Sequence, residues 1–205
     1  MKLTDEDLLP NESVVLKKNA NAVIGVTESG LTKFAFGKWM WVIGMKGKEA
    51  IGGKLYLTNY RLIFKSHRLN RLRGKFSIFL PTVTELEDTS FLMTRKVSIR
   101  TKWTKFDFVM WGISDFIKKA ESERANLTED KITELRKIAI ENFDKCGEGL
   151  QVFGGLENIN KVFLHKGKVS ELIKLATNPF EGLAAMAYDE LLDQAIVKPW
   201  QEKFE

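Results

Sequence analysis

Residues 55–64 read Leu55-Tyr56-Leu57-Thr58-Asn59-Tyr60-Arg61-Leu62-Ile63-Phe64. Two apolar runs rich in strand-forming residues flank a short polar break at Asn59. A break of this kind between two strand-forming runs predicts a tight β-hairpin. We place the hairpin at residues 54–66 and examine the rest of the chain outward from it.

Short strand-forming segments continue on both sides of this hairpin. The clearest alternation lies at 96–103, where Val97, Ile99, Thr101 and Trp103 share one face, as in a half-buried strand. Residues 33–46 have apolar side chains at both parities and fit one strand, two strands or a short helix. We expect the other strands at 12–24, 76–80, 82–86 and 106–110, followed by a helix with Ile113, Phe116, Ile117 and Ala120 on one face.

The hairpin also resembles the GRAM signature, G-x-L-x-L-T-N-x-R-L-I-F, of the pleckstrin-homology-like (PH-like) superfamily. The resemblance covers about residues 10–122 and is sharpest at 53–64. It implies an α+β fold, a PH-like β-barrel or sandwich capped by a C-terminal helix, although the element order alone also permits another α+β sandwich. Known family members are mostly membrane-associated or act as adaptors, so the resemblance implies binding and no catalysis.

Beyond residue 122 the pattern becomes helical, and we expect an all-helical appendage over 125–205. Residues 180–196 carry a wide apolar stripe. Packing on the barrel would cover this stripe, and so would self-association into a homo-oligomer or a partner helix.

Composition narrows the class of protein. The 205 residues are 44% hydrophobic and 29% charged, as in an ordinary folded domain. The longest apolar stretch, 39–45, is far shorter than the roughly 20 residues of a membrane span. One cysteine, Cys146, fits a reducing compartment, and the acidic start lacks the apolar core of a signal peptide. We therefore expect a cytosolic protein, with peripheral membrane association as an option.

The positive charge is concentrated in one segment. Residues 50–84 hold seven basic side chains and no acidic one, whereas the whole chain has a net charge of +5. Arginine and lysine in the loop after the hairpin could hold phosphate oxygens. The alternative is a solvated loop whose arginines pair with Glu85, Glu87 and Asp88. The predicted lipid- or anion-binding residues are Arg61, Lys65, Arg68, Arg71, Arg73 and Lys75.

An aromatic stretch at 34–45 is the second candidate. Trp39 and Trp41, bounded by lysines, have the composition of an element that inserts into a membrane interface. The alternative is that both tryptophans belong to core strands.

The sequence therefore predicts a non-catalytic binding module. We expect association with an anionic membrane surface or a phosphoinositide-type lipid, and the alternative is a protein-interaction adaptor that uses a sheet edge or the C-terminal helices. Nucleic acid is disfavoured because no known nucleic-acid-binding pattern is present. Two histidines and one cysteine form no metal-ligand spacing, and we predict no catalytic residue and no cofactor.

Overall fold

A computed structural model describes residues 3–23, 50–67, 70, 74–102 and 104–146, and further positions in a C-terminal helix. These positions are Phe180, Leu183, Ala184, Ala187, Tyr188 and Glu190 to Leu192. The segment 33–46 and the part of the expected helical appendage at 147–179 lie outside the described residues.

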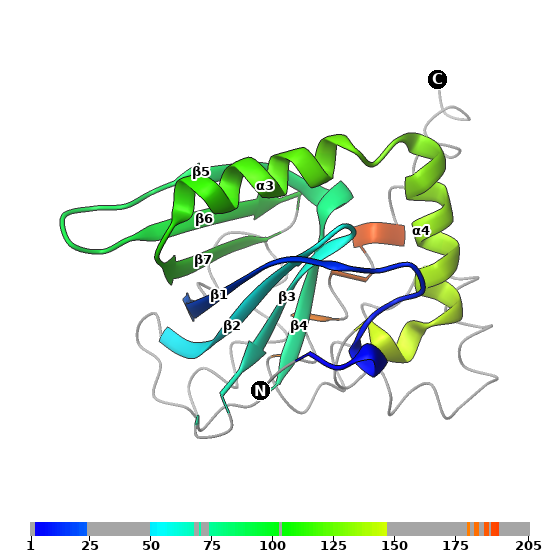
Figure 1. Ribbon diagram of the computed structural model, residues 1–205, viewed down its shortest axis with the longest axis horizontal. Helices are drawn as coiled ribbons and strands as arrows, with labels where there is room; N and C mark the ends of the chain where they lie inside the picture. The colour runs from blue at the N-terminus through cyan, green and yellow to red at the C-terminus, as the bar shows by residue number, and fades with distance from the viewer. Residues whose placement is uncertain are drawn as a thin grey trace, which may run out of the picture.

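The described chain contains one antiparallel seven-stranded sheet (Figure 1). The strand order is β4-β3-β2-β1-β7-β6-β5. The strands are β1 (Val14–Val23), β2 (Ala50–Thr58), β3 (Arg61–Ser66), β4 (Lys75–Phe79), β5 (Val83–Asp88), β6 (Lys96–Thr101) and β7 (Lys105–Met110). A 3-10 helix, η2 (Leu80–Thr82), joins β4 to β5.

The predicted hairpin is confirmed. Strands β2 and β3 pair antiparallel from Gly53–Ser66 to Leu57–Leu62, and Asn59 and Tyr60 form the turn. Thr58 stabilises that turn because its hydroxyl accepts hydrogen bonds from the backbone N–H groups of Tyr60 and Arg61, at 3.1 and 2.9 Å.

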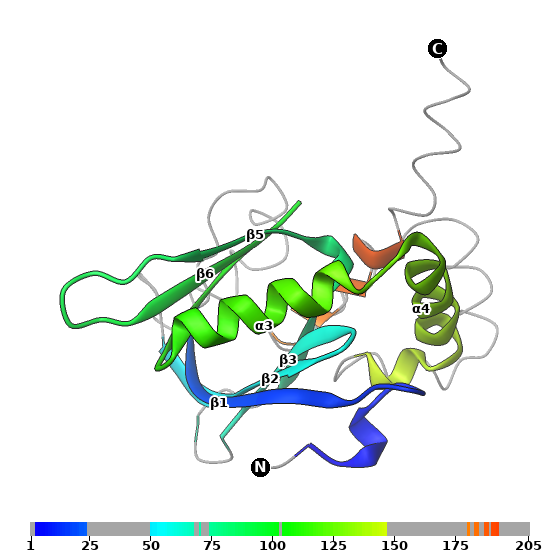
Figure 2. The ribbon, with the colours of Figure 1, turned by 45° about the horizontal axis from the view of Figure 1, so that its top comes forward.

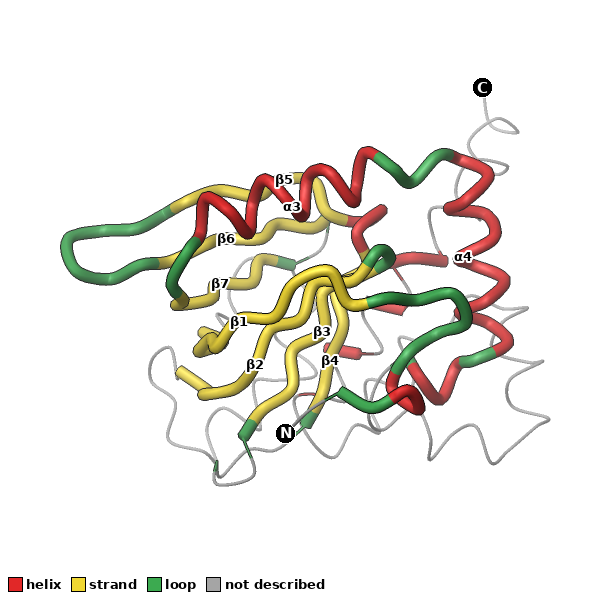
Figure 3. Tube along the Cα trace, viewed as in Figure 1, coloured by secondary structure: helices red, strands yellow, loops and turns green. Residues whose placement is uncertain are grey.

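Helix α3 (Ile113–Ala125) covers the inner face of the sheet, and α4 (Glu129–Glu141) stands at one end of it (Figures 1 and 3). Ile113, Phe116 and Ala120 of α3 are buried in the main core, as their spacing predicted. The α+β class and the closing helix are therefore confirmed. Among the described strands, β4 and β5 each have one neighbour, so this pairing leaves two sheet edges and fits a sandwich rather than a closed barrel.

Both faces of β3 and β4 are buried, which explains why neither strand shows a simple polar face. Leu62, Phe64 and Phe76 belong to the main core beneath α3. Phe79 points to a second core, which contains Leu135 of α4 and Leu191 of the C-terminal helix. Helix α4 and the C-terminal helix form a helical layer over this second face. In many antiparallel sheets that face is exposed to water.

The C-terminal helix also reaches the main core. Phe180 is completely buried, and its ring lies 6.4 Å from that of Phe64 and 5.8 Å from that of Phe76. Gly74 allows this approach, because a Cβ at that position would lie 2.6 Å from Phe180 Cβ. The described members of the apolar stripe at 180–196 therefore pack inside the chain. The boundaries at 10–122 and 125–205 stay a prediction.

Candidate functional site

Three of the six predicted anion-binding residues are buried. Arg61, Lys65 and Lys75 have exposed fractions of 1%, 9% and 6%. Their side chains extend from the face of β3 and β4 that the helical layer covers, opposite the main core. The prediction that these three belong to an exposed cationic surface is wrong, because acidic residues before β1 neutralise them.

Arg61 lies at the centre of the buried polar network. Its Nε donates to Glu12 Oε1 and its Nη2 to Glu12 Oε2, both at 2.9 Å. The remaining N–H groups reach Ser77 Oγ and the backbone carbonyls of Asp7 and Lys145. A guanidinium with these partners is satisfied, and it holds the segment before β1 against the sheet.

Asp7 neutralises the two lysines. Its carboxylate accepts hydrogen bonds from Lys65 Nζ at 2.9 Å and from Lys75 Nζ at 2.7 Å. Burial alone would raise the pKa of Asp7, but the hydrogen bonds from both lysines outweigh burial and hold this pKa well below its usual range. Among the described residues Glu85 pairs with Arg100 at 3.0 Å, and the loop arginines of the alternative pairing lie outside the described residues.

The other predicted site residues, Arg68, Arg71 and Arg73 together with Trp39 and Trp41, lie outside the described residues. The strand ends around them are described. Val23 of β1 pairs with Ala50 of β2, and Gly53 of β2 pairs with Ser66 at the end of β3. The chain therefore enters both connections at the same end of the paired strands.

Polar residues of the GRAM-like hairpin have structural partners. Asn59 Oδ1 accepts the backbone N–H of Ser13 at 2.8 Å, and its Nδ2 donates to the carbonyl of Asn11 at 3.0 Å. Thr58 Oγ1 donates to Glu12 Oε1 at 2.7 Å. Together with Arg61, these side chains dock the segment that precedes β1.

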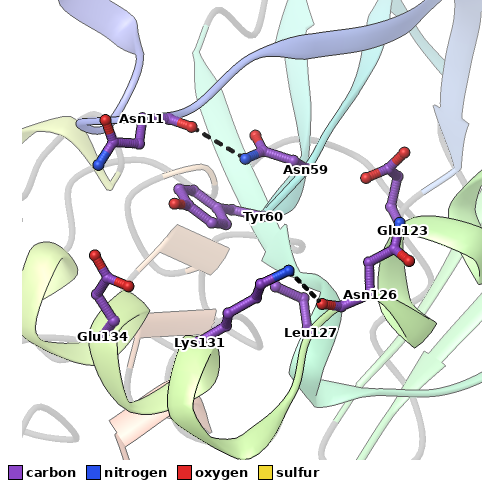
Figure 4. A pocket seen from close by; sticks show the side chains of 8 residues that line it. All are labelled: Asn11, Asn59, Tyr60, Glu123, Asn126, Leu127, Lys131 and Glu134. Atoms are coloured by element: carbon purple, nitrogen blue, oxygen red, sulfur yellow. Dashed lines mark hydrogen bonds between the residues drawn. The ribbon is translucent and has the colours of Figure 1, made fainter.

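A cavity of about 320 Å³ lies beside this turn, where the segment before β1 meets the connection between α3 and α4 (Figure 4). Its polar groups are partly used, since Asn59 binds Asn11 and Lys131 Nζ donates to the carbonyl of Asn126 at 3.0 Å. This volume lies at the lower end of the range of ligand pockets, about 300–1,000 Å³, but such pockets are lined mainly by apolar groups. The lining residues are Asn11, Asn59, Tyr60, Glu123, Asn126, Leu127, Lys131 and Glu134.

Among the described residues, the most exposed apolar run lies at the tip of the β5–β6 hairpin. Phe91, Leu92 and Met93 have exposed fractions of 74%, 83% and 94%. The connection that carries them extends away from the rest of the described chain in two views (Figures 1 and 2). Three consecutive large apolar side chains in water are unfavourable for a monomer, so they indicate a contact surface.

The backbone holds this tip in one conformation. Phe91 N–H donates to Thr94 O at 3.0 Å and Thr94 N–H donates to Phe91 O at 2.9 Å, which leaves Leu92 and Met93 as a two-residue turn. Leu92 has φ +51°, in the left-handed region that favours glycine or asparagine. A leucine there costs the fold roughly 1–2 kcal/mol and gains no burial.

Trp111 is a second exposed apolar residue near this hairpin. It is 77% exposed and follows Met110, whose N–H donates to the carbonyl of Arg95 at 3.0 Å. Trp111 therefore lies directly after β7, next to the start of β6, the strand that follows the tip.

The sequence interpretation missed the tip, although a signal was present. The run 91–93 interrupts a polar stretch and has no place in the strand alternation on either side. An apolar run with no buried face to occupy predicts exposure.

The part of the chain that the structure describes contains no group of histidine, cysteine, aspartate or glutamate suited to hold a metal ion. Cys146 is buried, and burial raises the pKa of its thiol to about 12. No helix within the described residues is long and apolar enough to cross a membrane.

Comparison with known proteins identifies one family. The family model of the GRAM domain matches residues 46–119. No curated protein matches the chain.

Two solved structures are similar in part. The C-terminal domain of an unknown protein from Leishmania infantum has 15% identity and a TM-score of 0.39, with 57% of this chain and 87% of that chain covered. The N-terminal PH domain of Vps36 has 12% identity and a TM-score of 0.42, with 62% and 91% covered. GRAM domains are in general lipid- or protein-interaction modules and are typically non-catalytic. The resemblance of the hairpin to the GRAM signature is thus confirmed, because the model of the GRAM domain matches residues 46–119, a range that contains the hairpin.

Proposed function

We propose that this chain is a peripheral membrane-binding module whose β5–β6 hairpin inserts its tip into the lipid interface. The observation that carries the proposal is the exposure of Phe91, Leu92 and Met93 on a hydrogen-bonded turn. The GRAM match supports it because lipid binding is one of the two general roles of that family.

Burial of each such side chain is worth roughly 1.5–3 kcal/mol, so three side chains give at most about 9 kcal/mol before the costs of association. That is the range of a single lipid anchor, which binds membranes marginally and reversibly. A second, electrostatic contribution is therefore needed for stable attachment. We assign it to Arg68, Arg71 and Arg73, each worth about 1 kcal/mol near an anionic surface, and we retain Trp39 and Trp41 as proposed inserting residues.

Vesicle co-sedimentation tests the proposal. The variant Phe91→Ser/Leu92→Ser/Met93→Ser should bind vesicles of mixed neutral and anionic lipid at least tenfold more weakly than the unmodified chain. Val14→Ser/Val15→Ser is the matched control, because these valines are also exposed, at 44% and 38%, on another element. Equal binding by the tip variant and the unmodified chain would refute the insertion role.

The electrostatic part is tested separately. Charge reversal at Arg68, Arg71 and Arg73 should remove the dependence of binding on anionic lipid and on salt, while it leaves the contribution of the tip intact. Binding that is indifferent to lipid charge in the unmodified chain would exclude the anionic preference.

A protein partner is the second candidate, and the same tip favours it. Aromatic and methionine side chains, here Phe91 and Met93, are enriched at protein interfaces, so this preformed turn also suits a hydrophobic pocket of another protein. Failure of the unmodified, folded chain to bind vesicles would exclude the membrane role and leave this candidate in place.

A further inference from the structure

Met93 carries the most exposed large apolar side chain in the part of the chain that the structure describes, with an exposed fraction of 94%. It lies on the β5–β6 turn that the two hydrogen bonds between Phe91 and Thr94 close, at 3.0 and 2.9 Å. The turn holds the side chain at the surface. The thioether sulfur of Met93 is therefore accessible to a reagent dissolved in the surrounding water.

Of the three apolar side chains at the tip, only that of Met93 can become polar through a reversible reaction. Phe91 and Leu92 end in hydrocarbon groups, whereas a thioether is oxidised to a sulfoxide. A hydroperoxide supplies the oxygen atom: its O–O bond breaks, an S–O bond forms, the sulfur loses two electrons, and the remainder of the peroxide leaves as water or an alcohol. Two classes of reductase, one for each sulfoxide epimer, reverse the reaction. A dithiol then provides two electrons and two protons, and the oxygen leaves as water.

The other described sulfur atoms are shielded from such a reagent. Met110, the last residue of β7, is 3% exposed and belongs to the main core. Cys146 is 1% exposed, and burial raises the pKa of its thiol to about 12, so little of the reactive thiolate is present. Among the described sulfur-containing residues, a peroxide in solution therefore has direct access only to Met93.

We propose that Met93 is a reversible oxidation site, at which a hydroperoxide releases the β5–β6 tip from the membrane. The inference rests on the proposed function, because it requires the tip to enter the lipid. A sulfoxide oxygen gives up its hydrogen bonds to water when it enters hydrocarbon, so the oxidised side chain favours the aqueous phase. Attachment through three apolar side chains is marginal, so the loss of one is sufficient to shift the chain into solution.

The first test measures the site without a membrane. The folded chain is treated with dilute hydrogen peroxide, and peptide mass spectrometry follows the oxidation of each methionine over time. Because oxidation depends on access to the sulfur, Met93 should be oxidised at least about tenfold faster than Met110. Equal rates for the two residues would overturn the proposal.

The second test measures binding to vesicles of phosphatidylcholine and phosphatidylserine. Oxidation should weaken co-sedimentation about fivefold or more, and reductases for both epimers with a dithiol should restore it. Met93→Leu replaces the thioether by an apolar group of similar volume, so this variant should bind equally before and after peroxide. Met110→Leu is the matched control, and it should lose binding on oxidation as the unsubstituted chain does.

The outcomes separate this inference from the insertion role. A chain that does not bind vesicles before oxidation would remove the insertion role and the oxidation switch together. Binding that survives complete oxidation of Met93 would overturn the switch alone. The variant Met93→Leu keeps the other five methionines of the chain. A loss of binding after peroxide in that variant would assign the effect to another residue and would also overturn the switch.

Discussion

Glu12 and Arg61 lie 49 residues apart in the sequence and form a buried bidentate ion pair, with both N–O distances at 2.9 Å. The pair joins the segment before β1 to the first residue of β3. The pair therefore holds the segment before β1 against the face of β3 that lies opposite the main core.

Breaking this pair should be costly. Arg61→Met leaves Glu12 buried without its cation, and we expect the free energy of unfolding to fall by about 3–5 kcal/mol in urea titrations. Arg61→Met combined with Glu12→Leu should cost less than the sum of the two single changes. The exposed pair Arg100–Glu85 is the control, and its removal should cost under about 1 kcal/mol. Additive single changes at Arg61 and Glu12 would contradict the coupling.

Because of Asp7, the stability of the folded chain should depend on pH in the acidic range. Its pKa in the folded chain lies below the ordinary value of 3.8, so its contribution is present above that value and is lost as the pH falls below it. Thermal unfolding between pH 2 and 6 should show Asp7→Asn less stable than the unmodified chain at pH 6. The difference should shrink towards pH 2, whereas a constant difference would show that the carboxylate charge is not the cause.

A substitution at Leu92 should change stability and vesicle binding in opposite directions. Leu92→Asn should raise the free energy of unfolding by roughly 1 kcal/mol, because asparagine adopts the observed φ of +51° more easily. The same change should weaken vesicle binding, since it removes an apolar side chain from the tip. Met93→Asn, at the neighbouring turn position, should weaken binding without this gain in stability. A Leu92→Asn variant that gains both stability and affinity would argue against the insertion role.

A substitution at Gly74 tests the contact between the region that the GRAM model matches and the C-terminal helix. Gly74→Ala would place a Cβ 2.6 Å from Phe180 Cβ, and we expect a loss of about 1–3 kcal/mol in the free energy of unfolding. At Gly52 a Cβ would lie 3.4 Å from its nearest neighbour, so Gly52→Ala should have little effect. Equal stabilities for the two variants would show that Phe180 does not pack against Gly74.

Cys146 should be unreactive in the folded chain. Burial raises the pKa of its thiol to about 12, and the residue is 1% exposed. A thiol reagent at pH 8 should label the protein only in denaturant. Cys146 is the single cysteine of the chain, so one measured rate reports it directly. Rapid labelling of the native chain would contradict its buried position.

The fold could be predicted largely from local patterns, because adjacent strands and their turns are encoded in nearby residues. The hairpin, the alternation at 96–101 and the spacing of Ile113 and Phe116 all lie within short stretches, and the structure confirms them.

The candidate site could not be predicted in the same way. Whether Lys65 is free or paired depends on Asp7, which lies 58 residues away, and no local pattern reveals that contact. The exposed run at 91–93 was visible in the sequence, but only the antiparallel pairing of β5 with β6 places it at a protruding turn.

The central position of β1 limits how this protein can be shortened. The GRAM match begins at residue 46, whereas β1 ends at Val23 and hydrogen-bonds to β2 on one side and β7 on the other. A fragment trimmed to the matched residues would contain two groups of strands with no strand to join them. Homology-guided truncation at residue 46 would therefore divide the sheet, and any recombinant fragment should keep β1 and the segment that precedes it.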